Sequence, residues 1–289
     1  MKNFLSLILT FILVASIFTS CNENIESSGT QEYTDEQSES LTEKQTNKET
    51  TKKETTKKET TKKETTKKET EKTYSESTAG LLFELNSDGN GYILTDTGNA
   101  KEIVIDGHKG LPVTELGGWL FYENKNITKI TLGGNIGMLY EKTFSNCPNL
   151  KTVIIKDKIT HIGAYAFENC TALETVIIGN DVTLIDKFAF NNCTSLKNLT
   201  LGNKLQTIET CAFQKCSSLT SIVIPASAKL IRESSFYYCN NLNSAEFKDP
   251  NNWGPDVDNS GYTYDLTDKK HAAEILRCAE WIYEGFRKH

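Results

Sequence analysis

Cysteine is the residue in this chain whose spacing could serve chemistry. Five of the eight cysteines stand 23 residues apart, at Cys147, Cys170, Cys193, Cys216 and Cys239. Thiolates can bind zinc or attack a substrate. However, a zinc site needs four converging ligands, and the chain has no C-x-x-C pair. Equal spacing of one residue type therefore indicates stacked copies of one structural unit.

Disulfides are the other chemistry that this ladder of cysteines suggests. An oxidising compartment would favour them. Side chains at the same place in stacked units run parallel to one another, however, and this is poor disulfide geometry. Because free cysteine is also a good small buried residue, we expect a reduced, packed ladder. Cys211 and Cys278 lie off the ladder, and either could pair elsewhere.

The remaining candidates for chemistry are weak. None of the four histidines has a metal or nucleophile spacing, and His161 is expected to point to solvent. The stretch 86–91 has a faint resemblance to a calcium loop, but its Asp-Gly and Asn-Gly pairs are strong hairpin turns. No nucleophile elbow, phosphate loop or dinucleotide fingerprint is present in a usable context. We therefore expect no catalytic residue, no metal site, no cofactor and no enzyme activity.

The elements around the cysteines share one frame. Counting from each cysteine, apolar residues recur three, six, eight, twelve and fifteen positions later, and an Ala-Phe pair ends the unit. The residues at six and eight have strand period, so both face inward and the residue between them faces outward. A period in the low twenties is typical of leucine-rich repeats. One unit cannot bury its own apolar face, so the pattern predicts a mostly β solenoid of about six stacked units.

The segment from Cys147 to Cys170 reads C-x-x-L-x-x-V-x-I…I-x-x-I-x-x-x-A-F-x-N-C. It resembles the BspA-type leucine-rich repeat of bacterial surface proteins, and the resemblance covers roughly Leu81–Phe247. Asn124 and Ala228 depart from the pattern, the first replacing cysteine and the second underfilling an aliphatic slot. The resemblance implies a hairpin cap before the repeats and a loop with a helix after them. It also implies adhesion to host or microbial surface proteins, with matrix proteins as the suspected class.

The chain divides into four regions by composition. Residues 1–20 read as a signal peptide, with Lys2 before a continuous apolar run. Cys21 follows in a context that resembles a bacterial lipobox, although an ordinary signal with a chance cysteine remains open. Residues 21–78 are the lipidated cysteine and a tether, residues 79–248 the solenoid with its hairpin cap, and residues 249–289 the C-terminal cap loop and helix.

The tether has the composition of a disordered segment. Thr51–Thr70 is Thr-Lys-Lys-Glu-Thr four times over, a period that fits neither helix nor strand. Low hydrophobicity and high charge predict disorder. We interpret the tether as a solvated spacer. The alternative is that its lysines bind an anionic polymer of the cell wall. Its threonines also permit O-glycosylation.

The charge of the chain indicates which classes of partner to expect. The formal net charge is −6, which does not favour nucleic acid. Residues 22–40 hold acidic groups without lysine or arginine and would be repelled by anionic headgroups. Membrane contact is therefore expected through the lipid on Cys21 alone. We expect an exported protein of the cell envelope, lipid-anchored and exposed on the bacterial surface.

The outward strand positions form the candidate binding site. They make an apolar, β-branched column beside a small polar column on the expected concave face. The eight residues of this candidate strip are Thr131, Ile154, Ile177, Thr200, Val223, Thr152, Thr175 and Asn198. Strand propensity alone explains β-branched residues here, whereas contiguous exposed apolar surface often marks an interface. Both interpretations stay open at this point.

Two further surfaces have alternative interpretations. A corner ridge of aromatic residues could bind a partner or pack on the adjoining repeat; its members are Tyr140, Tyr165, Phe188, Tyr237 and Tyr238. In the tail, apolar residues from Ala272 to Phe286 recur at helical spacing. They predict a helix over the last repeat, and an amphipathic membrane or partner helix is the alternative.

The sequence thus favours a surface-anchored module that recognises a protein partner through its solenoid face. A glycan- or nutrient-binding lipoprotein is the second hypothesis, and it predicts a polar, aromatic-lined concave face. A structural envelope protein is the third, and it predicts self-association without an external ligand.

Overall fold

The structure is a computed structural model that describes residues 74–117, 119–255, 266–277 and 286–288. The predicted signal peptide, the predicted lipidation residue Cys21 and most of the predicted tether lie outside these residues. Within the described ranges, no helix is long and apolar enough to cross a membrane.

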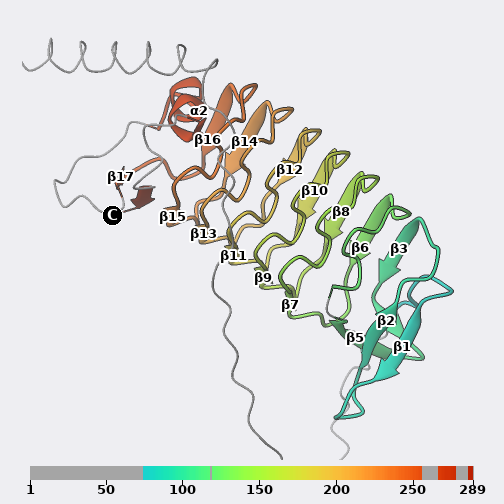
Figure 1. Ribbon diagram of the computed structural model, residues 1–289. Coiled ribbons are helices and arrows are strands. Elements are labelled where there is room, and N and C mark those ends of the chain that lie inside the picture. Colours follow the sequence, from blue (N-terminus) through green and yellow to red (C-terminus); the bar gives the residue numbers. More distant parts are fainter. Residues whose placement is uncertain (1–73, 118, 256–265, 278–285, 289) are drawn as a thin grey trace, which may run out of the picture. The chain divides into compact units, whose positions relative to one another are not determined.

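Each turn of the chain contributes one strand of three or four residues to a parallel arrangement that we call the long-strand sheet (Figure 1). The strands are β3 (Glu102–Ile105), β6 (Lys129–Leu132), β8 (Thr152–Ile155), β10 (Thr175–Ile178), β12 (Asn198–Thr200), β14 (Ser221–Ile224) and β16 (Ser244–Phe247). Strands β3 to β12 form one sheet, and β14 pairs with β16 in a second, two-stranded sheet. Val153 lies opposite Val176, so the sequence period is also the pairing register.

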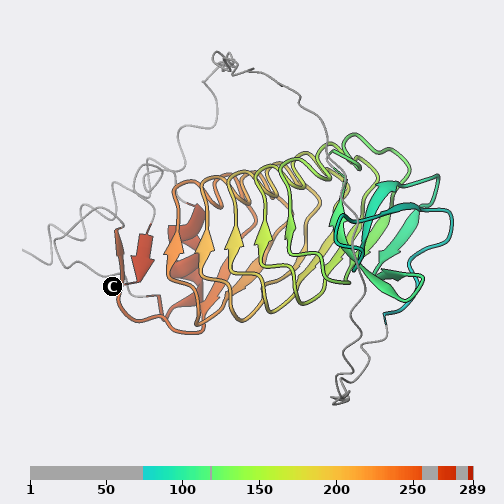
Figure 2. The ribbon, with the colours of Figure 1, turned by 90° about the horizontal axis from the view of Figure 1, so that it is seen from below.

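A second row of two-residue strands runs along the other side of the turns, and we call it the short-strand sheet (Figure 2). The strands are β7 (Met138–Leu139), β9 (His161–Ile162), β11 (Leu184–Ile185), β13 (Thr207–Ile208) and β15 (Leu230–Ile231). All neighbours pair in parallel without a break.

The core lies between the two sheets. Six phenylalanines, one per turn, are fully buried and stack face to face with ring centroids 4.5–5.2 Å apart: Phe121, Phe144, Phe167, Phe190, Phe213 and Phe236. The predicted inward slots are buried as well, apart from Leu199 and Leu201, which are half-buried. The predicted mostly β solenoid is confirmed, and its described part has about seven turns rather than about six.

The first turns carry additional strands. β1 (Leu82–Leu85) and β2 (Tyr92–Asp96) form the predicted hairpin, closed by a 2.9 Å bond from Asn86 N to Gly91 O. β5 (Leu111–Leu116) pairs with β2 and with β4 (Gly107–His108).

The segment just before the hairpin covers the edge of β3. Ser77 N donates to Gly107 O at 2.8 Å, and Thr78 N donates to Val104 O at 2.9 Å. The segment 75–78, which the sequence places in the tether, is therefore hydrogen-bonded to the solenoid. The hydrogen-bonded part of the described chain begins at Ser75, four residues before the predicted boundary at Ala79.

At the C-terminal end, α2 (Lys269–Arg277) packs on β16 and buries Ala272, Ala273, Ile275 and Leu276. The predicted helix was wrong at Phe286, which begins β18 (Phe286–Lys288). This strand pairs antiparallel with β15 and with β17 (Trp253–Pro255), because the open edge of the short-strand sheet offers backbone partners there. The capping roles of hairpin and helix remain predictions.

Candidate functional site

The long-strand sheet aligns four of the five residues in the main column of the candidate strip. Thr131, Ile154, Ile177 and Thr200 are direct register partners on β6, β8, β10 and β12. Neighbouring strands lie about 4.8 Å apart, so these side chains form a continuous row. The predicted register is thus confirmed for this part of the strip.

Exposure along the column is uneven. Ile177 is 41% exposed and Val223 is 45% exposed, whereas Ile154 and Thr131 are half-buried. The expectation that Ile154 and Ile177 are exposed side by side was therefore wrong for Ile154, because side chains on adjoining strands cover part of one another. Ile177 and Val223 are the apolar residues of the strip that a partner could contact most fully.

The polar column has a bond of its own. Thr152 and Thr175 are register partners, and Asn198 Nδ2 donates to Thr175 Oγ1 at 3.2 Å. This bond fixes one end of the Asn198 amide and leaves its oxygen facing an exposed surface.

Val223 stands apart from the other strip residues. It lies on β14, which pairs with β16 and not with β12, and its register partner is Glu246. Val223 therefore occupies the equivalent position on its own strand. It is not a register partner of Thr200, because β12 and β14 are not paired.

Charges bound the strip at both ends. Glu102 pairs with Lys129 at 3.8 Å near the first strands. At the other end Glu246 forms ion pairs with Lys248 and Lys269. Hydrogen bonds from those two ammonium groups lower the pKa of Glu246 to about 2. The eight residues of the strip itself are uncharged.

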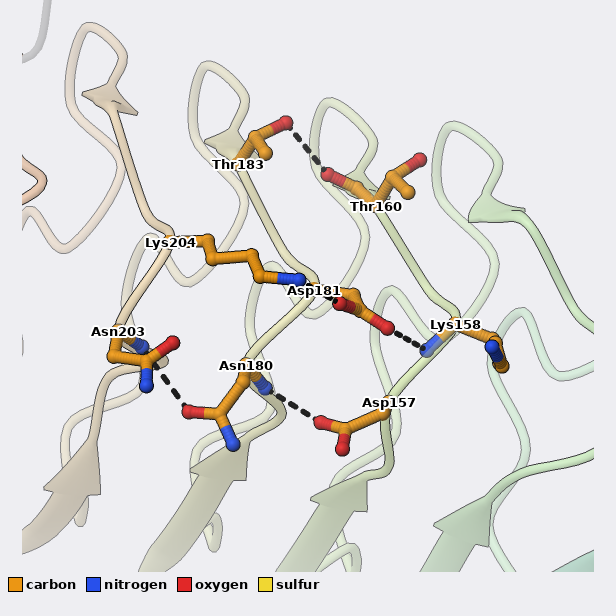
Figure 3. A network of polar contacts seen from close by, with 8 residues as sticks. All are labelled: Asp157, Lys158, Thr160, Asn180, Asp181, Thr183, Asn203 and Lys204. Atoms are coloured by element: carbon orange, nitrogen blue, oxygen red, sulfur yellow. Dashed lines mark hydrogen bonds and ion pairs between the residues drawn. The ribbon is translucent and has the colours of Figure 1, made fainter.

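A polar ladder follows the strand ends, and sequence reasoning missed it (Figure 3). Asn180 N donates to Asp157 Oδ1 at 2.7 Å, and Asn203 N donates to Asn180 Oδ1 at 3.3 Å. Asp181 accepts from Lys158 N at 3.0 Å and from Lys204 Nζ at 2.7 Å.

The Lys204 hydrogen bond, followed by that from Lys158 N, lowers the pKa of Asp181. The available signal was an Asp or Asn residue two or three positions after each of the strands β8, β10 and β12. The ladder uses its polar atoms to join successive turns, so we assign it a structural role.

The cysteine ladder is free and buried, as predicted. Each thiol donates to the carbonyl oxygen of the phenylalanine 26 residues earlier, with Sγ–O distances of 2.9 to 3.3 Å. The thiols therefore do more than fill space, since they satisfy buried carbonyl groups. Cys211 is also free and buried, and Cys278 lies outside the described residues.

Burial has a consequence at alkaline pH. It raises the pKa of Cys170, Cys193 and Cys216 above the ordinary value of 9.0. Above that pH the unfolded chain loses thiol protons that the folded protein keeps, so stability falls as pH rises. We expect the free energy of unfolding to fall by up to about 1.4 kcal/mol per pH unit for each such thiol.

Urea titrations between pH 8 and pH 10.5 measure this slope, and Cys193→Ala should reduce it. A free energy of unfolding that stays constant across this range contradicts the assignment. Alkylation of the folded protein at pH 8 followed by peptide mass analysis adds a check, since the ladder thiols should react only after unfolding.

The predicted corner ridge is not one surface. Tyr165 and Phe188 stack with centroids 5.0 Å apart, and the Lys142 ammonium lies 5.5 Å from the Tyr165 ring. Tyr237 and Tyr238 contact each other at 4.0 Å on a different row. The ring stack supports the packing interpretation for Tyr165 and Phe188.

The fifth member of the predicted ridge lies elsewhere. The Tyr140 hydroxyl donates to Glu115 Oε1 at 3.4 Å beside a shallow hollow that His161 also lines. The nearby Glu115 charge raises the pKa of Tyr140. His161 is half-buried and lies 3.4 Å from Asp186. No group of three or more His, Cys, Asp or Glu side chains in the described residues could hold a metal ion.

The asparagines before three of the cysteines serve the turn. Asn146, Asn169 and Asn192 have φ of 59°, 57° and 59°, in the left-handed region that asparagine tolerates. Their side chains are also linked, because Asn169 Nδ2 donates to Asn146 Oδ1 and Asn192 Nδ2 donates to Asn169 Oδ1, both at 3.0 Å.

Comparisons with known proteins agree with this geometry. A model of the BspA type leucine rich repeat region matches residues 160–252 in six copies. A comparison with curated proteins gave no match.

Similar solved structures were also found. A leucine rich repeat protein of T. pallidum is 27% identical, with 57% of this chain and 67% of that chain covered and a TM-score of 0.43. A leucine rich cell surface protein from Faecalibacterium prausnitzii is 28% identical, with 63% and 56% covered and a TM-score of 0.44. A leucine-rich repeat protein from Bacteroides ovatus is 22% identical, with 58% and 51% covered and a TM-score of 0.41.

The chain therefore spans between half and two thirds of these relatives. Repeats of the matched type suggest a protein-interaction or surface module. Residues 160–252 thus match repeats of the BspA type, and the register of the turns repeats with the same period.

Proposed function

We propose that this protein is a surface-exposed binding module that recognises a protein partner through the candidate strip. The observation that carries the proposal is the outward, uncharged row of the long-strand sheet, in which Ile177 and Val223 are 41% and 45% exposed. β-branched side chains on strands have few rotamers, so a partner meets each of them with little loss of side-chain freedom.

The surroundings of the strip support a protein rather than a sugar as the ligand. Aromatic rings are typical of glycan platforms, yet none of the eight strip residues is aromatic. The exposed aromatic residue Trp119 instead packs against Tyr122 at 5.1 Å, on a corner of the turns. An apolar centre with polar neighbours is the usual arrangement of a protein interface.

The proposal also covers how the protein is attached to the membrane. Cys21 is proposed to carry the lipid, and the segment up to residue 73 to carry the solenoid away from the membrane. A diacylglyceryl mass on the peptide that begins at Cys21 would support this part, and an unmodified thiol there would contradict it. Host matrix proteins or proteins of another cell's surface are the proposed partners.

A binding screen with matched variants tests the function. The purified full chain is immobilised and exposed to matrix proteins, polysaccharides and a second copy of itself. We expect a protein ligand, and we expect Ile177→Asp and Val223→Asp each to weaken it about thirtyfold, which corresponds to about 2 kcal/mol for an interface hot spot.

Met138→Asp is the matched control. Met138 is 37% exposed on β7, so it places the same new charge on the other sheet of the same solenoid. It should leave binding within about twofold of wild type. Equal binding by folded Ile177→Asp and Val223→Asp would reject the strip, and self-association alone would favour a structural envelope protein.

A further inference from the structure

The long-strand sheet is interrupted between its fifth strand, β12, and its sixth strand, β14. β12 ends the five-stranded sheet and β14 begins the two-stranded one. The short-strand sheet continues through the same two turns, because Ile208 on β13 pairs with Ile231 on β15. Figure 1 lets the reader follow β12 and β14 as consecutive strands, and we call the place between them the seam. The two turns are therefore joined by a strand ladder on one side only.

The loss of hydrogen bonds between the two turns is confined to the seam. In the described chain, none joins residues 195–204 to residues 219–226. Bonds resume on either side, with Ser218 N donating to Thr194 O at 3.1 Å and Lys229 N donating to Gln206 O at 2.8 Å. The adjacent strands are normally paired, over three residues between β10 and β12 and over four between β14 and β16.

Burial changes at the same place. Leu199 and Leu201 occupy the inward slots of β12, yet both are half-buried. The equivalent residues one turn earlier, Val176 and Ile178, are 0% and 3% exposed. Both leucines are thus partly exposed to solvent at the seam, where β12 has no paired strand on one of its two sides.

Pro225 removes one hydrogen-bond donor at the seam. The residue that follows the strand donates its N–H to the preceding strand at three other turns, with Lys156 N to Leu132 O at 2.9 Å and Lys248 N to Ile224 O at 3.0 Å among them. Proline has no N–H. Leu201 O therefore cannot receive the backbone bond that Leu132 O and Ile224 O accept, and the seam loses one bond that would help to close it.

We propose that the solenoid flexes at the seam, with the β13–β15 ladder as the hinge. Segments with few hydrogen bonds and half-exposed apolar residues open most easily. Opening changes the spacing between Ile177 and Val223, which lie on opposite sides of the seam, and thus the width of the strip. The flexing itself does not depend on the proposed function, although its use in binding does.

Paired spin labels measure the motion without any ligand. Labels at Thr175 and Ser244 span three turns and cross the seam, whereas labels at Lys129 and Asn198 span three turns without crossing it. Attachment through an unnatural amino acid leaves the free thiols untouched. We expect the seam-crossing distance distribution in the full chain to be at least about twice as broad as the control distribution. Equal widths would overturn the hinge.

Two reciprocal substitutions test the cause. Pro225→Lys restores a donor for Leu201 O and should narrow the Thr175–Ser244 distribution to the control width. It should also slow amide exchange at Val223 by about tenfold. Lys156→Pro removes the equivalent bond between β6 and β8 and should broaden the Lys129–Asn198 distribution. If Pro225→Lys changes neither width nor exchange, the assignment of Pro225 is wrong.

Discussion

Gly202→Ala is expected to destabilise the protein by about 3 kcal/mol, because there is no room for a methyl group at this position. A Cβ atom on Gly202 would lie 2.1 Å from Gly179 O and 2.8 Å from Gly179 C. Both are backbone atoms, so the clash is relieved only by moving one turn away from the next. The glycine is therefore required by the close approach of successive turns. Urea unfolding of the wild type and the variant measures the effect.

Gly137→Ala is the matched control for this prediction. A Cβ atom there meets nothing within 4 Å, and alanine restricts the unfolded chain, so the change should stay within about 1 kcal/mol of wild type. If both variants unfold at the same urea concentration, the spacing of turns is more compliant than the structure indicates.

The period of the cysteines was sufficient to predict the register of the sheets. Residues 23 apart become direct partners, as Val153 and Val176 are, because each turn repeats the same path. The same period predicted the buried slots and the outward position of Ile177. It could not predict how far each outward side chain is covered, since the exposure of Ile154 depends on its neighbours on both sides.

Departures from the period were harder to interpret. Asn124 replaces a cysteine, and its Oδ1 accepts hydrogen bonds from Asn126 N at 2.9 Å and Ile127 N at 3.0 Å. It therefore closes its own turn with an amide oxygen, whereas the cysteines at the same position donate to a carbonyl oxygen 26 residues earlier. Pro225 was visible in the sequence, but its effect on pairing depends on a carbonyl in the preceding turn. Both cases need the partner group to be known before the residue can be interpreted.

The tail shows the limit of local patterns. Helical spacing predicted one helix through Phe286, and the part up to Arg277 is helical. Phe286 instead lies opposite Ile231 in an antiparallel pair. Helical spacing describes a stretch of chain by itself, whereas the edge of β15 is supplied by residues far away in the sequence. Such a long-range partner can override local preference.

Phe190→Ala is expected to lower the free energy of unfolding by about 3–5 kcal/mol, the usual range for removing a buried aromatic side chain. Phe190 is fully buried, with Phe167 5.0 Å and Phe213 5.1 Å from its ring centroid. Its loss removes ring contacts with two turns at once. Because each turn of a solenoid is stabilised by its neighbours, we expect the cavity to weaken both adjoining interfaces. Urea unfolding followed by circular dichroism measures the change.

Phe188→Ala separates the effect of position from that of residue type. Phe188 is two residues away and half-buried, and it stacks on Tyr165 at 5.0 Å. This substitution should therefore lower the free energy of unfolding by no more than about 1.5 kcal/mol, the upper end of the range for one aromatic pair. Equal losses from the two variants would show that the buried stack carries no special share of the stability. A broadened, two-step transition for Phe190→Ala alone would instead show that the turns on either side of it can unfold separately, as nearest-neighbour coupling requires when one interface is weakened.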